Sequence, residues 1–171
     1  MMRRIESSST PSFLLLGYTP SWTISSLQAI HHLLITPSSI TARKPLAATA
    51  RRAGWIGCNI LLEQIPKEGR IDLVRDGVAL PRSQSRREFA KSEKLRKLSV
   101  TERTWSATIL NLVHQLGKTT FTLQDAYRFE DELNTLYPSN RHIREKIRQQ
   151  LQVLRDMGFL DFVTRGIYTL K

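Results

Sequence analysis

The sequence predicts an α+β fold, with short strands in the first part of the chain and helices in the last part. Residues 13–76 contain short apolar runs bounded by Gly, Pro and Ser, a pattern typical of buried strands. From Ser99 onward, apolar residues recur at helical spacing instead. We therefore expect a strand-rich unit over residues 1–80, a charged connector over residues 81–98 and a helical unit over residues 99–171.

The strand-rich unit is expected to contain four main strands. They lie in FLLLGY, WTISSLQAIHHLLIT, GWIGCNILLEQIP and GRIDLVRDG, each bounded by Gly, Pro or Ser. Residues 42–52 are basic and rich in small side chains, so we predict a loop there. The connector is dense in charge, and its pattern is compatible with a helix, a solvated linker or a contact with phosphate.

Capping signals mark the first two helices. Ser99 and Glu102 form a capping box, and Gly117 is expected to end the first helix. A short β-prone stretch follows at residues 119–122. Thr122 then starts a second helix, which is expected to run to about Tyr137 because Pro138 stops it.

The third helix, with Ser139 or Asn140 as its expected cap and Gly158 as its end, has two contrasting faces. One face is an apolar stripe formed by Ile143, Ile147, Leu151, Leu154 and Met157. The other is rich in Arg and Gln, which pair bidentately with guanine and adenine edges in a major groove. The residues of this region that we expect to contact DNA are Asn140, Arg141, Arg144, Arg148, Gln149 and Gln152.

The chain ends in a predicted hairpin whose strands are FLDFVT and IYTLK. They enclose a two-residue turn with Arg165 at its tip. The order helix, strand, helix, helix, strand, strand is that of a winged helix, a member of the helix-turn-helix class. A polar helix face can also be simply solvated, but the wing arginine favours double-stranded DNA as the partner.

The overall charge points to the same partner. The formal net charge is +11 and the pI about 10.4, which suits a polyanion. Residues 101–171 contain 10 Lys and Arg against 8 Asp and Glu, so most of the excess lies in residues 1–100. The single cysteine, Cys58, excludes an intramolecular disulfide and a Cys-rich zinc site. No apolar run approaches the ~20 residues that span a bilayer, and we expect a cytoplasmic monomer without membrane contact.

Several long segments resemble the DpnI and Dam-replacing family of methylation-dependent type II restriction endonucleases. They are KIRQQLQVLRDMGFLDF, TLQDAYRFEDEL, RKPLAATARRAGWIGCNILL and QIPKEGRI, and the similarity covers almost the whole chain. The resemblance implies a nuclease domain of the PD-(D/E)xK type followed by a winged helix, both recognising GATC with N6-methyladenine. It also implies Mg²⁺ for cleavage, a structural Zn²⁺ held by four cysteines, and a position for Trp55 against the methylated adenines.

One departure from the family concerns catalysis. The four-cysteine site, the catalytic acid and Glu-x-Lys are expected upstream of FLLLGY, and these 171 residues contain none of them. The segment most similar to Glu-x-Lys is Glu68-Gly69-Arg70. Arginine cannot replace the lysine there, because its pKa is too high to be adjusted near a metal-bound water. We therefore predict no catalytic or metal-binding residues in this chain, and residues 1–80 as the last part of a nuclease domain, inactive alone. An alternative is an active nuclease whose coding sequence extends upstream of Met1.

A function of a different class also fits the sequence, namely a stand-alone winged-helix DNA-binding regulator or adaptor without a nuclease role. Arg51 and Arg52 are expected to contact phosphate or only to aid solubility, and Trp55 could instead be a core residue on a strand. His31 and His32 are expected to point to opposite faces of a strand, without a third ligand for a metal. An open sheet would expose apolar faces, so we expect residues 1–80 to be the less stable half.

Overall fold

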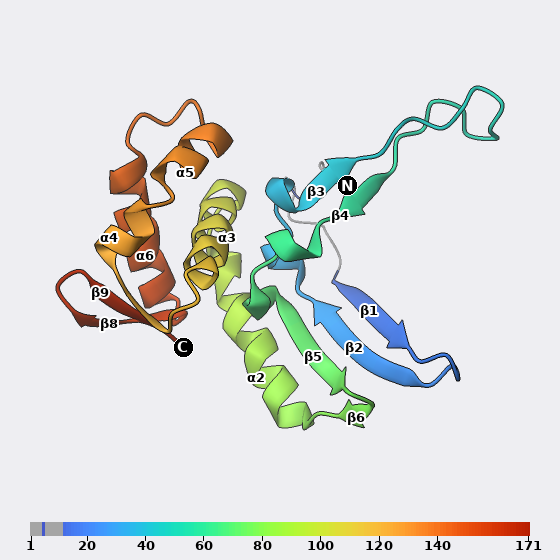
Figure 1. Ribbon diagram of the computed structural model, residues 1–171, viewed down its shortest axis with the longest axis horizontal. Coiled ribbons are helices and arrows are strands. Elements are labelled where there is room, and N and C mark those ends of the chain that lie inside the picture. The colour runs from blue at the N-terminus through green and yellow to red at the C-terminus, as the bar shows by residue number, and fades with distance from the viewer. Residues whose placement is uncertain (1–4, 6–11) are drawn as a thin grey trace.

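The first part of the chain forms a four-stranded antiparallel sheet flanked by one helix (Figure 1). This computed structural model describes Ile5 and residues 12–171. The connector forms helix α2 and a 3-10 turn, so the helix is confirmed for this segment. Ser85 Oγ on α2 donates a hydrogen bond to the Asp72 carbonyl of the sheet at 3.1 Å. The strands, in sheet order, are β1 (Phe13–Tyr18), β2 (Ile24–Ile30), β5 (Arg70–Arg75) and β6 (Val78–Ala79), and the helical pieces are α2 (Arg82–Glu93) and η5 (Lys94–Lys97).

Two of the predicted strands are shorter than expected. Strand β2 ends at Ile30, and the following residues form a 3-10 turn, so HHLLIT is not strand. Strand β4 likewise ends at Ile60, because LLEQIP also turns. The 3-10 turns of this part are η1 (His32–Leu34), η2 (Pro37–Ser39), η3 (Leu62–Gln64) and η4 (Lys67–Gly69).

A separate hairpin, β3 (Ile40–Ala42) with β4 (Cys58–Ile60), projects away from the sheet (Figure 1). Residues 43–57 beyond its strands, here called the arm, contain the predicted loop. Two backbone hydrogen bonds keep the arm narrow, from Arg43 N to the Gly57 carbonyl at 2.9 Å and from Leu46 N to the Trp55 carbonyl at 3.0 Å. The basic loop is thus held at the end of a two-stranded extension.

The last part of the chain is a winged helix, with its elements in the predicted order. Its three-stranded sheet has the order β7-β9-β8. The second helix differs from the prediction because it breaks into two at Arg128 and Phe129, although no Gly or Pro marks the break. The elements are α3 (Val100–Gln115), β7 (Thr120–Thr122), α4 (Leu123–Tyr127), α5 (Glu130–Leu136), α6 (Ile143–Asp156), β8 (Leu160–Thr164) and β9 (Ile167–Leu170).

Most of the helix ends follow the local signals. The Ser99 and Glu102 capping box is formed, with both hydrogen bonds present. Gly117 and Gly158 follow their helices with φ of 66° and 81°, a conformation that favours glycine. The predicted cap of the third helix is wrong, because α6 begins at Ile143 with His142 at its N-cap and no side-chain cap.

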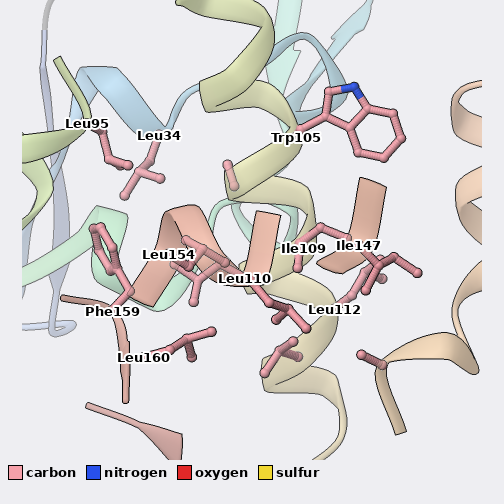
Figure 2. Close-up of a cluster of buried hydrophobic side chains, with 14 of the residues drawn as sticks. Leu34, Leu95, Trp105, Ile109, Leu110, Leu112, Ile147, Leu154, Phe159 and Leu160 are labelled. Atoms are coloured by element: carbon pink, nitrogen blue, oxygen red, sulfur yellow. The ribbon is translucent and has the colours of Figure 1, made fainter. Parts of the chain in front are cut away.

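A single hydrophobic cluster joins the two parts of the chain (Figure 2). Leu34 of η1 and Leu95 of η5 are fully buried in the same cluster as Leu110 of α3 and Leu154 of α6. Beside this cluster, the Glu68 carboxylate lies 2.8 Å from His114 Nε2 of α3, with both side chains largely buried. The winged helix is therefore packed directly on the turns of the first part.

Candidate nucleic-acid interface

Helix α6 is oriented with its apolar stripe inward and its Arg and Gln side chains outward. Packing on α3 fixes this orientation: Ser106 Oγ of α3 donates a 2.7 Å hydrogen bond to Oε1 of Gln150, which is fully buried. Lys146 Nζ lies 5.6 Å from the Trp105 ring on the flank of the same contact. The stripe residues Ile143, Ile147, Leu151 and Leu154 are buried, whereas Arg141, Arg144, Arg148, Gln149 and Gln152 are exposed.

Two arginines of the exposed face are held by residues of the second helix. Arg144 Nε donates to Glu130 Oε2 at 2.7 Å, and Arg148 Nε donates to the Tyr127 hydroxyl. Both guanidinium groups also lie over the Tyr127 ring, at 5.2 Å for Arg144 and 5.7 Å for Arg148. The hydrogen bond with Glu130 raises the pKa of Arg144, and the one with Tyr127 raises the pKa of Arg148. Sequence reasoning missed Tyr127 and Glu130, although both lie in TLQDAYRFEDEL.

Asn140, one of the residues predicted to contact DNA, makes a local hydrogen bond before the N-terminal end of α6. Asn140 Oδ1 accepts a 2.8 Å hydrogen bond from His142 N, so its amide oxygen shapes the turn before the helix. Gln149 Oε1 accepts from Lys146 Nζ at 2.8 Å, which leaves the Gln149 amide NH₂ available as a donor. Arg141 and Gln152 form no hydrogen bond or ion pair with the described residues and face solvent.

The wing places Arg165 at the end of the molecule where α6 lies. Arg165 is exposed in the turn between β8 and β9, as predicted, and Gly166 has a φ of 76°. Leu123 N, at the start of α4, donates to the Gly166 carbonyl at 2.7 Å. This bond ties the wing turn to the helix that also carries Tyr127, so Arg165 is displayed from a fixed base.

The arm carries the remaining predicted residues, and Figure 1 shows it on the opposite side of the molecule from the wing. Arg51, Arg52 and Trp55 are all exposed at the arm. The alternative of a core tryptophan is wrong, because 53% of Trp55 is exposed. Its ring lies over Gly57, where a Cβ would come within 3.0 Å of the ring. The structure thus separates the predicted residues into an α6–wing group and an arm group.

The metal sites that the family resemblance implies do not fit the residues present. Cys58 cannot supply a four-cysteine zinc site. Glu68 and Asp72, two carboxylates that a magnesium site could use, already have other partners. Glu68 contacts His114, and Asp72 accepts hydrogen bonds from Gln28 Nε2 at 2.6 Å and from Arg75. Among the described residues, the one group of His, Cys, Asp and Glu side chains close enough to share an ion is His31, His32 and Glu93.

The expected geometry of the two adjacent histidines is also wrong. Because β2 ends at Ile30, His31 and His32 lie in the following turn rather than on a strand. Their rings are stacked, with centroids 4.9 Å apart, and point to the same side of the chain. Glu93 supplies the third group from α2, which is 61 residues away in sequence and carries no spacing signal.

A helix that crosses a bilayer must be both long and apolar. None of the helices of residues 12–171 is long enough and apolar enough to do so.

Two protein-family models match the chain. The Dam-replacing family model matches residues 1–98. The Dam-replacing HTH domain model matches residues 101–170, which contain α3 to β9. These domains bind DNA and have a methylation-dependent, restriction-type function. The chain belongs to the Dam-replacing family, with its N-terminal domain followed by a C-terminal helix-turn-helix domain.

Proposed function

We propose that this chain binds double-stranded DNA at GATC sites that carry N6-methyladenine, with α6 in the major groove. The observation that carries the proposal is the exposed face of α6, whose Arg and Gln side chains stand opposite a fully packed apolar stripe. A recognition helix needs this arrangement, because it must dock on the domain while offering donors to base edges.

Arg144 and Arg148 are the best candidates for reading guanine. Each uses its Nε for a partner on the second helix, so both terminal Nη groups stay available. Guanine O6 and N7 accept such a pair of donors. The Tyr127 ring already restricts both side chains in the free protein. Less side-chain conformational entropy is therefore lost when DNA binds.

The arm is proposed as a second and separate DNA contact, because it lies on the opposite side of the molecule from the wing. Arg51 and Arg52 would lie on phosphates, while Trp55 would place its ring against the methyl group of the modified adenine. Support comes from the exposure of Trp55 at the end of a hairpin with basic neighbours. A methyl group on the base would add apolar contact with the aromatic face. The methylated base would therefore bind more tightly than the unmethylated one.

Cleavage is not part of the proposal for this chain alone. No Asp or Glu stands two residues before a lysine in these 171 residues, and the carboxylates near Glu68 are engaged in ion pairs and hydrogen bonds. The second candidate function is a winged-helix regulator or adaptor that binds DNA without regard to methylation. The complete winged helix, from α3 to β9, is the observation that favours it.

A binding titration separates the two functions. Fluorescence anisotropy is measured with four duplexes that differ only in the site: fully methylated GATC, hemimethylated GATC, unmethylated GATC and a permuted sequence. We expect affinity to fall in that order, with at least about tenfold between the first and the last. Equal affinity for methylated and unmethylated GATC, whether or not the permuted duplex binds as well, would favour the regulator or adaptor, and no measurable binding to any of the four duplexes would contradict both.

Two arginine variants test the roles of helix and wing. Arg148→Ala should cost about 1–3 kcal/mol on the methylated site and narrow the gap to the permuted duplex. Arg165→Ala should weaken binding to all four duplexes alike and lower the salt slope by about 1. Lys67→Ala, which removes an exposed charge from η4, is the control and should leave binding unchanged. Identical behaviour of the first two variants would refute the assignment of roles.

A further inference from the structure

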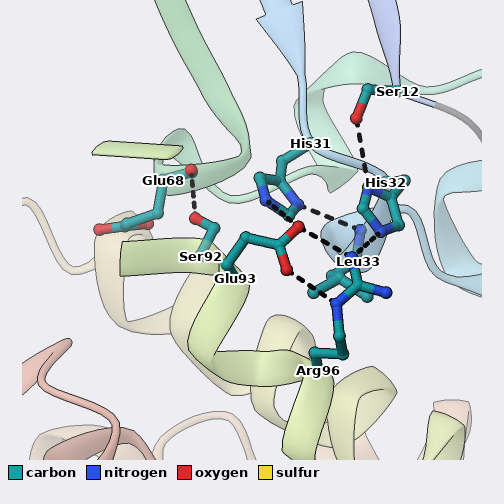
Figure 3. A network of polar contacts seen from close by, with 8 residues as sticks. All are labelled: Ser12, His31, His32, Leu33, Glu68, Ser92, Glu93 and Arg96. Atoms are coloured by element: carbon teal, nitrogen blue, oxygen red, sulfur yellow. Dashed lines mark hydrogen bonds and ion pairs between the residues drawn. The ribbon is translucent and has the colours of Figure 1, made fainter. Parts of the chain in front are cut away.

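His31, His32 and Glu93 form a convergent donor set that DNA binding does not use (Figure 3). The histidines lie at the end of β2 and the start of η1, and Glu93 is the last residue of α2. One potential ligand atom from each side chain lies within 4.8 Å of the other two. Two imidazoles and a carboxylate are the ligands that Zn²⁺ and similar divalent ions prefer.

His31 offers a buried ring nitrogen, Nε2, that lacks a well-formed hydrogen bond among the described residues. The side chain is fully buried, and only a weak interaction with the Phe89 backbone reaches the ring, although a buried polar atom normally has a full hydrogen bond. This atom lies 3.7 Å from Glu93 Oε1, so it faces the centre of the group. Burial is the main cause that lowers the pKa of His31 to about 4, so the ring is neutral at pH 7 and able to act as a ligand.

His32 has the tautomer that a metal ligand requires. Its Nε2 lies 3.2 Å from Arg96 Nη2, and a guanidinium can only donate, so Nε2 accepts. The ring proton therefore lies on Nδ1, which donates to Ser12 Oγ at 3.2 Å. Metal-binding histidines typically donate their other N–H to a neighbouring oxygen in this way.

The Arg96 guanidinium now occupies the place of a cation. Nε and Nη2 donate to the two Glu93 oxygens, at 2.8 Å and 2.9 Å, and Nη2 also donates to His32 Nε2 at 3.2 Å. The Arg96 side chain is 59% exposed, so it can turn into solvent without opening the core. The site thus already favours a positive charge, and the Arg96 side chain that supplies it can move away.

We propose that His31, His32 and Glu93 bind one Zn²⁺-like divalent transition-metal ion, which displaces Arg96 and joins the end of β2 to α2. Zinc–ligand distances of about 2.0–2.2 Å require the donors to close in, and the partly exposed Glu93 has room to move. Coordination at His31 Nε2 moves the ring proton to Nδ1. This shift breaks the 3.3 Å hydrogen bond from Leu33 N to Nδ1 and requires the imidazole ring to turn so that two N–H groups do not face each other.

The test is a zinc titration of the full chain carrying Cys58→Ser, which removes the exposed thiol as a competing ligand. We expect saturable binding of one equivalent by calorimetry and a melting temperature that rises with Zn²⁺. Co²⁺ should give visible absorption bands that Zn²⁺ abolishes. Glu93→Gln and His32→Gln should each weaken binding at least about tenfold. His142→Gln, which removes an exposed imidazole, is the matched control and should leave binding unchanged.

Arg96→Gln provides the decisive variant because it keeps all three donors. If the guanidinium competes with the ion, this variant should bind Zn²⁺ about tenfold more tightly. Unchanged or weaker binding by Arg96→Gln would overturn the proposal, as would the absence of one-equivalent binding in the Cys58→Ser chain. A loss of affinity in His142→Gln as large as that in His32→Gln would also overturn it. Circular dichroism of each variant shows whether it is folded, and Arg96→Gln decides the question if the others are not.

Discussion

The two parts of the chain differ in how completely they bury their apolar side chains. In the winged helix, the apolar residues of α3 and α6 are buried against one another. In the first part, strand β1 leaves Leu14, Leu15 and Leu16 at least 40% exposed, and the arm exposes Trp55 and Ile56. Ten of the thirteen exposed large hydrophobic residues among those described lie between Leu14 and Val78. The winged helix closes its own core, whereas the sheet is covered on the α2 side and open elsewhere.

The junction shows that this difference is not a division into independent halves. The turns η1 and η4 contribute Leu34 and the Glu68 contact to the packing around α3. Strand β1, in contrast, is an edge strand that pairs only with β2 among the residues that the structure describes. Stability should therefore fall with distance from α3 rather than step down at a domain boundary.

A pair of leucine substitutions offers the strongest way to break this comparison. Leu154→Ala removes a fully buried side chain of α6 and should lower the free energy of unfolding by about 2–5 kcal/mol. Leu14→Ala makes the same chemical change at a position where the residue is 62% exposed. This substitution should change the free energy of unfolding by less than about 0.5 kcal/mol. Urea denaturation measures both. Equal losses would mean that β1 is packed as tightly as α6.

Local signals explain why the winged helix could be predicted from sequence. Its boundaries depend on neighbouring residues, such as the Ser99 and Glu102 capping box and Gly158 in a left-handed conformation. The amphipathic spacing of α6 correctly separated its buried and exposed faces. The split of the second helix at Phe129 escaped prediction, because tertiary packing around Leu133 rather than a helix breaker accompanies it.

Distant contacts explain what the sequence did not reveal about the sites. The support of Arg148 by Tyr127 joins residues 21 positions apart, and that of Arg144 by Glu130 spans 14 positions. The His31, His32 and Glu93 group depends on where β2 ends and how α2 packs on the sheet. The arm residues were chosen from charge and resemblance, and their exposure supports that choice while their role stays a prediction.

Amide hydrogen exchange sharpens the comparison along the chain. We expect the amides of β1 and the arm to exchange at least about tenfold faster than those of α6, because few buried contacts hold them closed. Residues of η1 should resemble α3 rather than β1, since Leu34 lies in the shared core. Equal protection of β1 and α6 would contradict the idea that the first part is the less stable one.

The smallest expected effect concerns acid and the start of α4. The Thr122 backbone N–H donates to Asp125 and is the main cause that lowers its pKa to about 2, with Lys118 also contributing. Because the folded pKa lies below the ordinary value of 3.8, ionised Asp125 stabilises the fold above about pH 4, and this stabilisation disappears as the pH falls towards 2. Asp125→Asn should therefore lower the urea midpoint at pH 5, and its difference from the parent chain should shrink on acidification. Asp161→Asn is the matched control, because it removes an exposed wing carboxylate whose ion pair with Lys171, at 2.7 Å, lies at the surface and contributes little. A difference that stays constant from pH 5 to pH 2 would show that the effect of Asp125 on the winged helix is not electrostatic.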